Sequence, residues 1–366
     1  MRVLQCTKRS VTLLAAACVA LSACGDSGPE APFNPTGTTE DIAAVHDAFA
    51  SPAFASFSTF SLYFDAALGT SPVISGSAEA FNFRRTTKAG EFRAAATRNA
   101  RRVAALMQGR VQSSLSASTA AIPVEVAGKT FEYNGTEYVS TDRTGAPSNG
   151  VRFIIYAVNP VTLEPALPLQ EVGYVQLTDL SGSTTQAARV LVVSGDITYL
   201  DYTVTAMATT AGGLITVAGY VTDGATRANV NLRSTVNQTA GLTMLYSIDV
   251  PQRDVSIDLT MSTTGLDPET ATFGIDLGMS GPNGTVSMSG QFTATGGTIV
   301  VRVNGDVFAN ITSEGPGEPI ITGADGQPLT AEDQATFQNI FALTGEAFIT
   351  FDVMLLPIGF FLAPTT

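Results

Sequence analysis

Apolar and polar residues alternate along most of the chain between residues 129 and 311. A period of two is typical of β-strands that bury one face and expose the other. The clearest case is residues 254–263, where every second residue from Val255 to Met261 is apolar. The pattern predicts strands at residues 129–139, 150–158, 171–180, 187–194, 197–208, 213–222, 228–236, 242–250, 254–263, 270–280, 284–294 and 298–311.

Short turn signals separate the predicted strands. Asp223-Gly224 and Asn283-Gly284 are dipeptides that favour tight turns, and Pro251 marks another turn. Strands that follow one another through short loops form an antiparallel meander. Because a ten-residue strand is about 33 Å long, these strands favour one large sheet that curls into a half-barrel or a barrel, with a β-sandwich as the alternative.

A closed barrel of this size would have an interior to fill. About eleven strands tilted by about 40° would leave roughly 12 Å between facing side chains. An aromatic helix, an apolar ligand or collapse into a sandwich would fill that space. The predicted fold is therefore mainly β with N-terminal helices (α+β), in which the helices pack against a large antiparallel meander sheet.

Helices are predicted ahead of the sheet, in a helical region at residues 41–115. Ile42, Val45 and Phe49 have helical spacing, and Pro52 ends that run. The next run places four phenylalanines on one helix face, namely Phe54, Phe57, Phe60 and Phe64. We interpret this stripe as the core side of a helix rather than as a ligand site.

The β domain is expected to span residues 116–366 and to hold a further helix near its end. Thr330 is a candidate N-cap for a helix at residues 331–344. A last strand is expected over residues 348–356, which are apolar on both faces and should therefore be buried.

The N-terminus has the organisation of an export signal. Three cationic residues precede an apolar run that ends in Leu21, Ser22, Ala23 and Cys24. The run is too short to span a hydrocarbon layer of about 30 Å. It resembles the type II signal peptide of bacterial lipoproteins, with a lipobox at residues 21–24. The resemblance implies that residues 1–23 are removed, that Cys24 is acylated (palmitate), and that the protein is anchored in the bacterial cell envelope.

The residues after the lipobox are expected to be a tether. Residues 25–40 are rich in proline and glycine, so residues 24–40 are interpreted as a lipidated cysteine followed by a flexible linker. Such a linker reaches roughly 20 to 25 Å. Asp26 stands second after Cys24 and does not match the inner-membrane retention signal known for some lipoproteins. The outer membrane is therefore the expected location.

Few groups suited to catalysis would remain after the signal is removed. Cys6 and Cys18 would leave with the signal, Cys24 would become a thioether, and His46 is the only histidine. These losses exclude disulfides, thiolate nucleophiles, cysteine metal sites and histidine-based triads. We therefore expect a non-enzymatic protein with no catalytic residue, no metal site and no cofactor.

The net charge argues against nucleic acid as a partner. The formal charge is −13, and loss of Arg2, Lys8 and Arg9 with the signal would take it to −16. Such a chain is repelled by nucleic acid and by anionic lipid. Cations are nevertheless concentrated at residues 84–110, where Glu91 is the only acid. Anionic lipid headgroups or an acidic partner would fit this segment, but a solvated helix face is the favoured interpretation.

Four methionines fall on the apolar face of neighbouring predicted strands, namely Met244, Met261, Met279 and Met288. Methionine side chains adapt their shape to varied apolar partners. This face is therefore the candidate site for an apolar ligand, with filling of the core as the plainer interpretation.

One pair of carboxylates is also a candidate site. Asp249 and Asp254 flank the turn at Pro251, and a two-residue loop would place them opposite each other. Paired carboxylates serve glycoside hydrolysis or calcium binding, but a hairpin tip offers no cleft and too few oxygens. A solvated turn is therefore the favoured interpretation.

Three functional hypotheses follow from these observations. The first is a lipid-anchored envelope lipoprotein that acts as a binding or scaffold module, with the membrane, a lipid-like molecule or an envelope protein as its partner. In architecture alone it resembles the half-barrel lipoprotein carriers. The second is a transmembrane β-barrel, for which long alternating strands are also the signature. The third is a carboxylate-dependent hydrolase.

Overall fold

The computed structural model describes residues 35–49, 51–67, 121–159, 162, 164–183, 185–209, 212–237, 241–264, 271–293, 295–314, 320–340 and 353–355. The chain separates into two compact units, Met1–Phe33 and Asn34–Thr366, and all described residues belong to the second. Cys24 and the cationic segment 84–110 lie outside the described residues, so the inferences drawn from them stay predictions.

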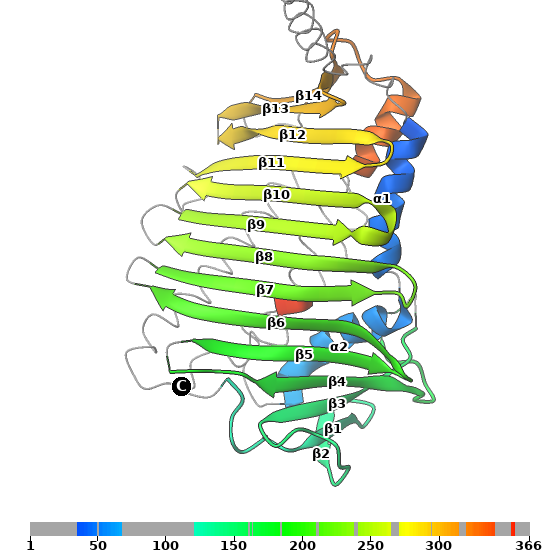
Figure 1. Ribbon diagram of the computed structural model, residues 1–366, viewed down its shortest axis with the longest axis vertical. Helices are drawn as coiled ribbons and strands as arrows, with labels where there is room; N and C mark the ends of the chain where they lie inside the picture. The colour runs from blue at the N-terminus through cyan, green and yellow to red at the C-terminus, as the bar shows by residue number, and fades with distance from the viewer. Residues whose placement is uncertain are drawn as a thin grey trace, which may run out of the picture. The chain divides into compact units, whose positions relative to one another are not determined.

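One sheet of 15 strands dominates the described structure (Figure 1). The strands lie in the order β15-β14-β13-β12-β11-β10-β9-β8-β7-β6-β5-β4-β3-β1-β2, which is sequence order except beside β3. Neighbours are antiparallel, apart from the parallel pair of β1 and β3. The predicted mainly β fold with a large meander sheet is therefore confirmed.

The strands span Thr130–Tyr133 (β1), Tyr138–Thr141 (β2), Gly150–Tyr156 (β3), Glu171–Asp179 (β4), Gln186–Ser194 (β5), Ile197–Thr209 (β6), Gly212–Thr222 (β7), Arg227–Asn237 (β8), Gly241–Val250 (β9), Val255–Thr264 (β10), Thr272–Gly281 (β11), Gly284–Thr293 (β12), Gly296–Val303 (β13), Asp306–Ser313 (β14) and Ile320–Gly323 (β15).

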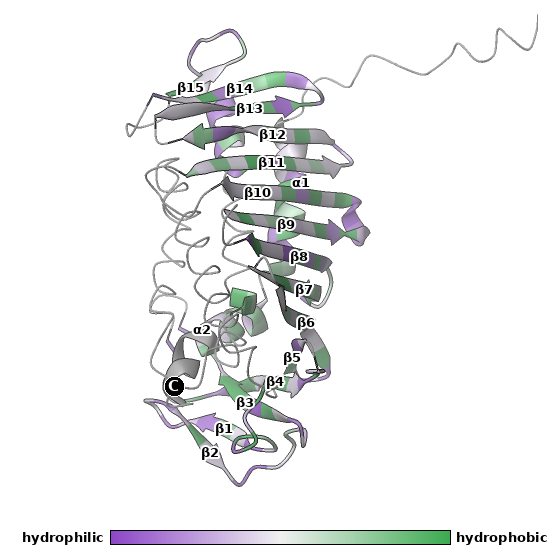
Figure 2. Ribbon diagram, turned by 90° about the vertical axis from the view of Figure 1, so that its left-hand side faces the viewer, coloured by the Kyte–Doolittle hydropathy of each residue, from purple (hydrophilic) through white to green (hydrophobic). Residues whose placement is uncertain are grey.

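The sheet is open, with β2 and β15 as its two edges. The closed-barrel form of the prediction is wrong for these strands, and the sandwich alternative is not formed either, because a single sheet contains them all. Helices pack against one face of the sheet (Figure 2). They help to bury the apolar side of the strands, so the sheet need not close on itself to remove that side from water.

The two faces of the sheet differ as the alternation predicts. In β10 the apolar residues Val255, Ile257, Leu259 and Met261 are buried, and the residues between them point to the opposite side. The same alternation runs along the neighbouring strands, as the hydropathy colours in Figure 2 show. We call the buried apolar side the inner face and the opposite side the outer face.

Two predicted strands are hairpins instead. Residues 129–139 form β1 and part of β2 around Asn134-Gly135, and residues 298–311 form β13 and most of β14 around Asn304-Gly305. Asn304 and Gly305 have φ values of 49° and 86°, as a tight type I′ turn requires. The apolar residues of β13 and β14 stay at odd positions across this turn, so the alternation alone does not reveal it.

Helix α1 (Pro35–Phe49) begins earlier than the pattern indicates. Residues 35–40 are helical, so the flexible tether does not extend to residue 40. Proline suits the first position of a helix because its missing N–H would have no partner there. The buried side of α1 includes Ile42 and Val45, as the helical spacing predicts.

Helix α2 (Pro52–Ala67) places its phenylalanines against the inner face. The ring of Phe57 meets the ring of Tyr202 at 6.4 Å in an edge-on contact, and Phe60 lies 4.9 Å from Phe153 between ring centroids. The interpretation of this stripe as the core side of a helix is confirmed for Phe54, Phe57 and Phe60.

The C-terminal part differs from the prediction in one respect. Residues 331–340 are helical, and Oγ1 of Thr330 accepts a hydrogen bond from the backbone N–H of Asp333 at 3.2 Å, as expected of an N-cap. Residues 353–355 are also helical, so the strand predicted over 348–356 is wrong there. The hydroxyl of Tyr202 donates to the carbonyl of Met354 at 2.9 Å and ties this turn to the sheet. None of the helices described is long and apolar enough to cross a membrane.

Candidate functional site

The structure brings the four methionines of the candidate site onto the inner face. Met244 of β9 and Met261 of β10 stand directly opposite each other in the strand register. Met279 pairs with Val286, which is two residues from Met288 on β12, and Met288 pairs with Leu277. The four side chains are at most 4% exposed. They therefore all belong to the core surface of β9–β12, where other apolar residues such as Ile275 and Leu277 separate the Met244–Met261 pair from Met279 and Met288.

The described inner face around these methionines holds no buried charged side chain. Among the buried residues that the structure describes on β7–β13, none carries a formal charge. The nearest aromatic group of β9 on this face is Tyr246, two residues from Met244. A ligand that lies on this face would therefore be recognised through apolar contact and neutral hydrogen bonds rather than through ion pairs.

Two hydroxyls interrupt the apolar inner face beside the methionine pair. Ser234 of β8 pairs with Met244, and Thr263 of β10 lies two residues beyond Met261, opposite Leu242. Ser234 is 0% exposed and Thr263 is 8% exposed. The Oγ atom of Ser234 and the Oγ1 atom of Thr263 have no hydrogen-bond partner in the structure.

Sequence reasoning missed both hydroxyls. Serine and threonine are frequent on the outer face of these strands, so two more of them do not stand out. The only available signal is their position, because each occupies a residue number at which the alternation calls for an apolar side chain.

Helix α1 contacts β7, β8 and β10 and lies beside the strand ends that hold the β9–β10 and β11–β12 turns (Figure 1). Its Asp41 is buried at 5% exposure and accepts two hydrogen bonds from Asn283 in the β11–β12 turn. Its Thr39 accepts a hydrogen bond from Nδ2 of Asn339, in the helix of residues 331–340, at 3.3 Å. The N-terminal half of α1 is thus held by polar contacts, while its buried apolar side faces the sheet.

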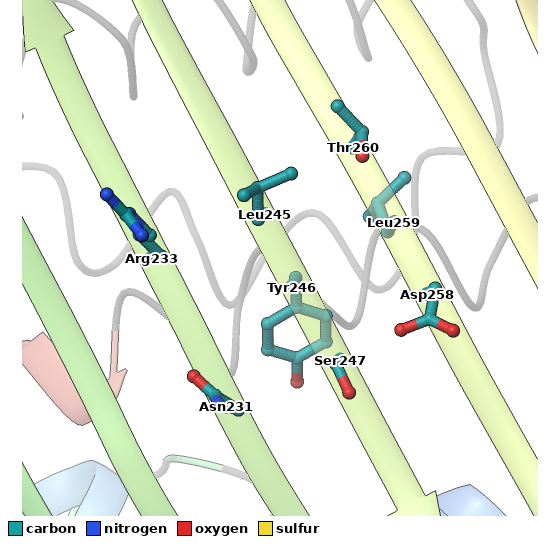
Figure 3. A pocket seen from close by; sticks show the side chains of 8 residues that line it. All are labelled: Asn231, Arg233, Leu245, Tyr246, Ser247, Asp258, Leu259 and Thr260. Carbon is teal, nitrogen blue, oxygen red and sulfur yellow. The ribbon is translucent and has the colours of Figure 1, made fainter.

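The outer face carries a shallow hollow of about 250 Å³ over β8, β9 and β10 (Figure 3). Arg233 and Asp258 stand on β8 and β10, and Leu245 of β9 lies in the strand between them. The remaining lining residues are Asn231, Ser247 and Thr260, which are on the outer face, and Tyr246 and Leu259, whose side chains are buried on the inner face.

This hollow offers hydrogen-bond donors and acceptors to a ligand, but it would remove little water from them. Arg233 and Asp258 make no ion pair with any residue that the structure describes, and both are exposed. Charged groups in contact with water hold a small ligand weakly, because the solvent screens them. The inner face is therefore the stronger candidate site.

The predicted pairing of Asp249 and Asp254 is wrong. Residues Pro251–Arg253 form a 3-10 turn, so that Val250 pairs with Val255 and Asp249 stands opposite Ser256. Asp254 lies outside the strand in the left-handed region, with φ 52°. Asp249 instead accepts a hydrogen bond from Nδ2 of Asn229 at 3.2 Å. The longer loop thus separates the two carboxylates that a hydrolytic or calcium site would need.

Within the described part of the chain, no group of three or more His, Cys, Asp or Glu side chains could hold a metal ion. His46 is in α1 and belongs to no such group among the described residues. Comparison with known proteins finds no matching family, no matching characterised protein and no matching solved structure.

Proposed function

We propose that the protein is a lipid-anchored, non-enzymatic binding module of the bacterial envelope, and that its inner face takes lipid-like apolar ligands. The observation that carries the proposal is the opposed pair of Met244 and Met261, with Met279 and Met288 further along the same face of an open sheet, whose described buried residues carry no formal charge. Flexible thioether side chains suit a surface that accommodates acyl chains of different shape.

The open sheet supports the proposal because its cover is made of separate elements. In a closed barrel, each strand is held by hydrogen bonds on both sides, and access to the interior is limited to the two ends. Here α1 lies against the sheet and is held by the buried Asp41–Asn283 contact, among others. Separation of such a helix from β8 and β10 would open the inner face without breaking the strand ladder.

The predicted lipid anchor would place the proposed binding activity next to a membrane. An acylated Cys24 and a tether that ends where α1 begins would keep the sheet near the bilayer from which a lipid could be taken. The outer membrane is the proposed location, and a lipid or an envelope component is the proposed partner.

The test uses a Cys24→Ala variant in which an ordinary secretory signal replaces residues 1–23. This protein is exported without a lipid anchor. Native mass spectrometry should detect one or more co-purified lipids, and a fluorescent diacyl lipid should bind with saturation. A protein that carries no lipid and does not bind the fluorescent lipid would overturn the proposal.

Neighbouring residues of β9 provide a matched pair of variants. Met244 faces inward at 3% exposure, whereas Leu245 faces outward at 45% exposure. We expect Met244→Ala to weaken binding of the fluorescent lipid several-fold and Leu245→Ala to leave it unchanged. Met244→Leu, which nearly conserves volume, should keep the fold intact and isolate the contribution of the thioether. Equal effects of Met244→Ala and Leu245→Ala would place the ligand elsewhere.

A further inference from the structure

Ser234 and Thr263 are two buried residues of the inner face whose hydroxyl oxygens lack a hydrogen-bond partner in the structure, as does the hydroxyl oxygen of Thr130 on β1. A buried hydroxyl that finds no partner costs free energy relative to an apolar side chain of the same shape. Valine or alanine would fill either position of the apolar face without that cost. The presence of two such groups beside one methionine pair therefore needs an explanation.

The strand register fixes how the two hydroxyls lie. Ser234 is in the row that contains Met244 and Met261, and Thr263 is two strands away and two residues further along. With strands about 4.8 Å apart and a rise of about 3.4 Å per residue, the two Cα atoms are separated by about 12 Å. Leu242 and Met244 lie between them. The hydroxyls thus stand at opposite corners of one apolar patch.

We propose that these hydroxyls donate hydrogen bonds to the two ester carbonyls of a diacyl lipid whose chains lie on the methionine face. This inference rests on the proposed function and names its ligand class. Side chains on one face whose Cα atoms are about 12 Å apart suit two acceptor oxygens that are roughly 6 to 9 Å apart, once a hydrogen bond of about 2.8 Å is allowed at each end.

The neutral surroundings favour an ester over a free carboxylate. No described residue of the inner face near Ser234 and Thr263 carries a positive charge. A fatty-acid carboxylate placed there would be desolvated without a counter-charge, which costs far more than burial of a neutral ester. The two hydroxyls can satisfy an ester carbonyl, and they cannot neutralise an anion.

The sequence supplies a closely matched control. Thr235 follows Ser234 in β8, and Ser262 precedes Thr263 in β10, and both neighbours point to the outer face. The test variant is Ser234→Ala with Thr263→Val, and the control variant is Thr235→Val with Ser262→Ala. The two double variants make the same chemical changes on opposite faces of the same two strands.

Binding is measured with two probes, a diacyl ester phospholipid and its dialkyl ether analogue, which has no carbonyl oxygens. We expect the wild-type protein and the control variant to prefer the ester lipid by about 10-fold or more, since each hydrogen bond contributes roughly 3- to 10-fold. The test variant should bind both lipids equally, at the level of the ether analogue. Palmitate, the free fatty acid, should bind less tightly than the ester lipid.

The unfolding midpoint separates this role from a structural one. Because neither hydroxyl has a partner in the protein, the test variant should unfold at the same denaturant concentration as the wild type or at a higher one. A lower midpoint would mean that the hydroxyls serve the fold, which would overturn the inference.

Failure of the inference can be told apart from failure of the proposed function. If ester and ether lipids bind wild-type protein equally well, the protein binds lipid but the hydroxyls do not recognise the ester. That result would contradict this inference alone. If neither lipid binds, the proposed function falls, and the inference falls with it.

Discussion

Asp41 and Asn283 are 242 residues apart in the chain and are joined by two hydrogen bonds. Nδ2 of Asn283 donates to Oδ1 of Asp41 at 2.9 Å, and the backbone N–H of Asn283 donates to Oδ2 at 3.2 Å. Asp41 is nearly buried, so both bonds are made by a carboxylate that has left most of its water. This contact connects the first helix to the turn between β11 and β12.

Substitution Asp41→Ala should destabilise the protein by about 2 to 3 kcal/mol, because it removes two hydrogen bonds to a charged acceptor and leaves the Asn283 amide without that partner. Urea denaturation checks this value. Asp47→Ala, on an exposed position of the same helix, should change the free energy of unfolding by less than about 0.5 kcal/mol. A similar loss in both variants would show that the helix, rather than the Asp41–Asn283 contact, is responsible.

The buried tyrosines predict a loss of stability at alkaline pH. Burial raises the pKa of Tyr202 well above its ordinary value of 10.0, and burial is also the main cause of the raised pKa of Tyr138. The unfolded chain releases these phenolic protons above about pH 10, whereas the folded protein keeps them. The free energy of unfolding should therefore fall as the pH rises through about 10, and these groups should contribute no pH dependence at neutral pH.

Urea denaturation at a series of alkaline pH values measures this decline, and the ultraviolet absorbance of phenolate should rise together with unfolding. Tyr202→Phe should flatten the decline, although it also costs about 1 to 2 kcal/mol at neutral pH because the carbonyl of Met354 loses its donor. Tyr220→Phe is the control, since Tyr220 stacks under Arg227 on the outer face and should leave the slope unchanged. An unaltered slope in Tyr202→Phe would contradict the argument.

The sheet was predictable from the sequence because a half-buried strand imposes a period of two on the residues that form it. The same rule does not determine where one strand ends and the next begins. In β13 and β14 the apolar residues keep odd residue numbers on both sides of the turn, so only the Asn304-Gly305 dipeptide shows where the turn lies. The position of Asp254 was not predictable either, because the length of its loop depends on the 3-10 turn before it.

The candidate site was predictable in its apolar part alone. The alternation along each strand predicts that the methionines share a face. That Met244 stands opposite Met261 depends on the register between β9 and β10, which the alternation does not determine. The hydroxyls of Ser234 and Thr263 can be identified as candidate ligand-binding groups only when their burial and hydrogen bonding are known. The helical state of residues 353–355 is a tertiary outcome, since their apolar run fits a buried strand or a buried helix equally well.

The Asn304-Gly305 turn predicts a position-specific effect of glycine substitution. Gly305 has φ 86°, so Gly305→Ala places a side chain in a conformation that L-residues disfavour and should cost about 1 to 2 kcal/mol. Gly278→Ala on β11 is the control, because a Cβ atom there meets no atom within 4 Å. Differential scanning calorimetry should show a lower unfolding temperature for the first variant and little change for the second. An equal loss in both variants would exclude the turn as the cause.

The predicted lipobox leads us to expect that Cys24 is the cysteine that determines where the protein is found. We expect labelled palmitate to enter the wild-type protein in a bacterial host, and the protein to sediment with membranes. Cys24→Ala should abolish incorporation of the label, because no other cysteine follows the expected cleavage position. The double variant Cys6→Ala with Cys18→Ala should incorporate the label normally, since both residues precede that position and would be discarded with the signal. Incorporation of the label by Cys24→Ala, or its loss from the Cys6 and Cys18 variant, would refute the assignment of Cys24 as the lipidated residue.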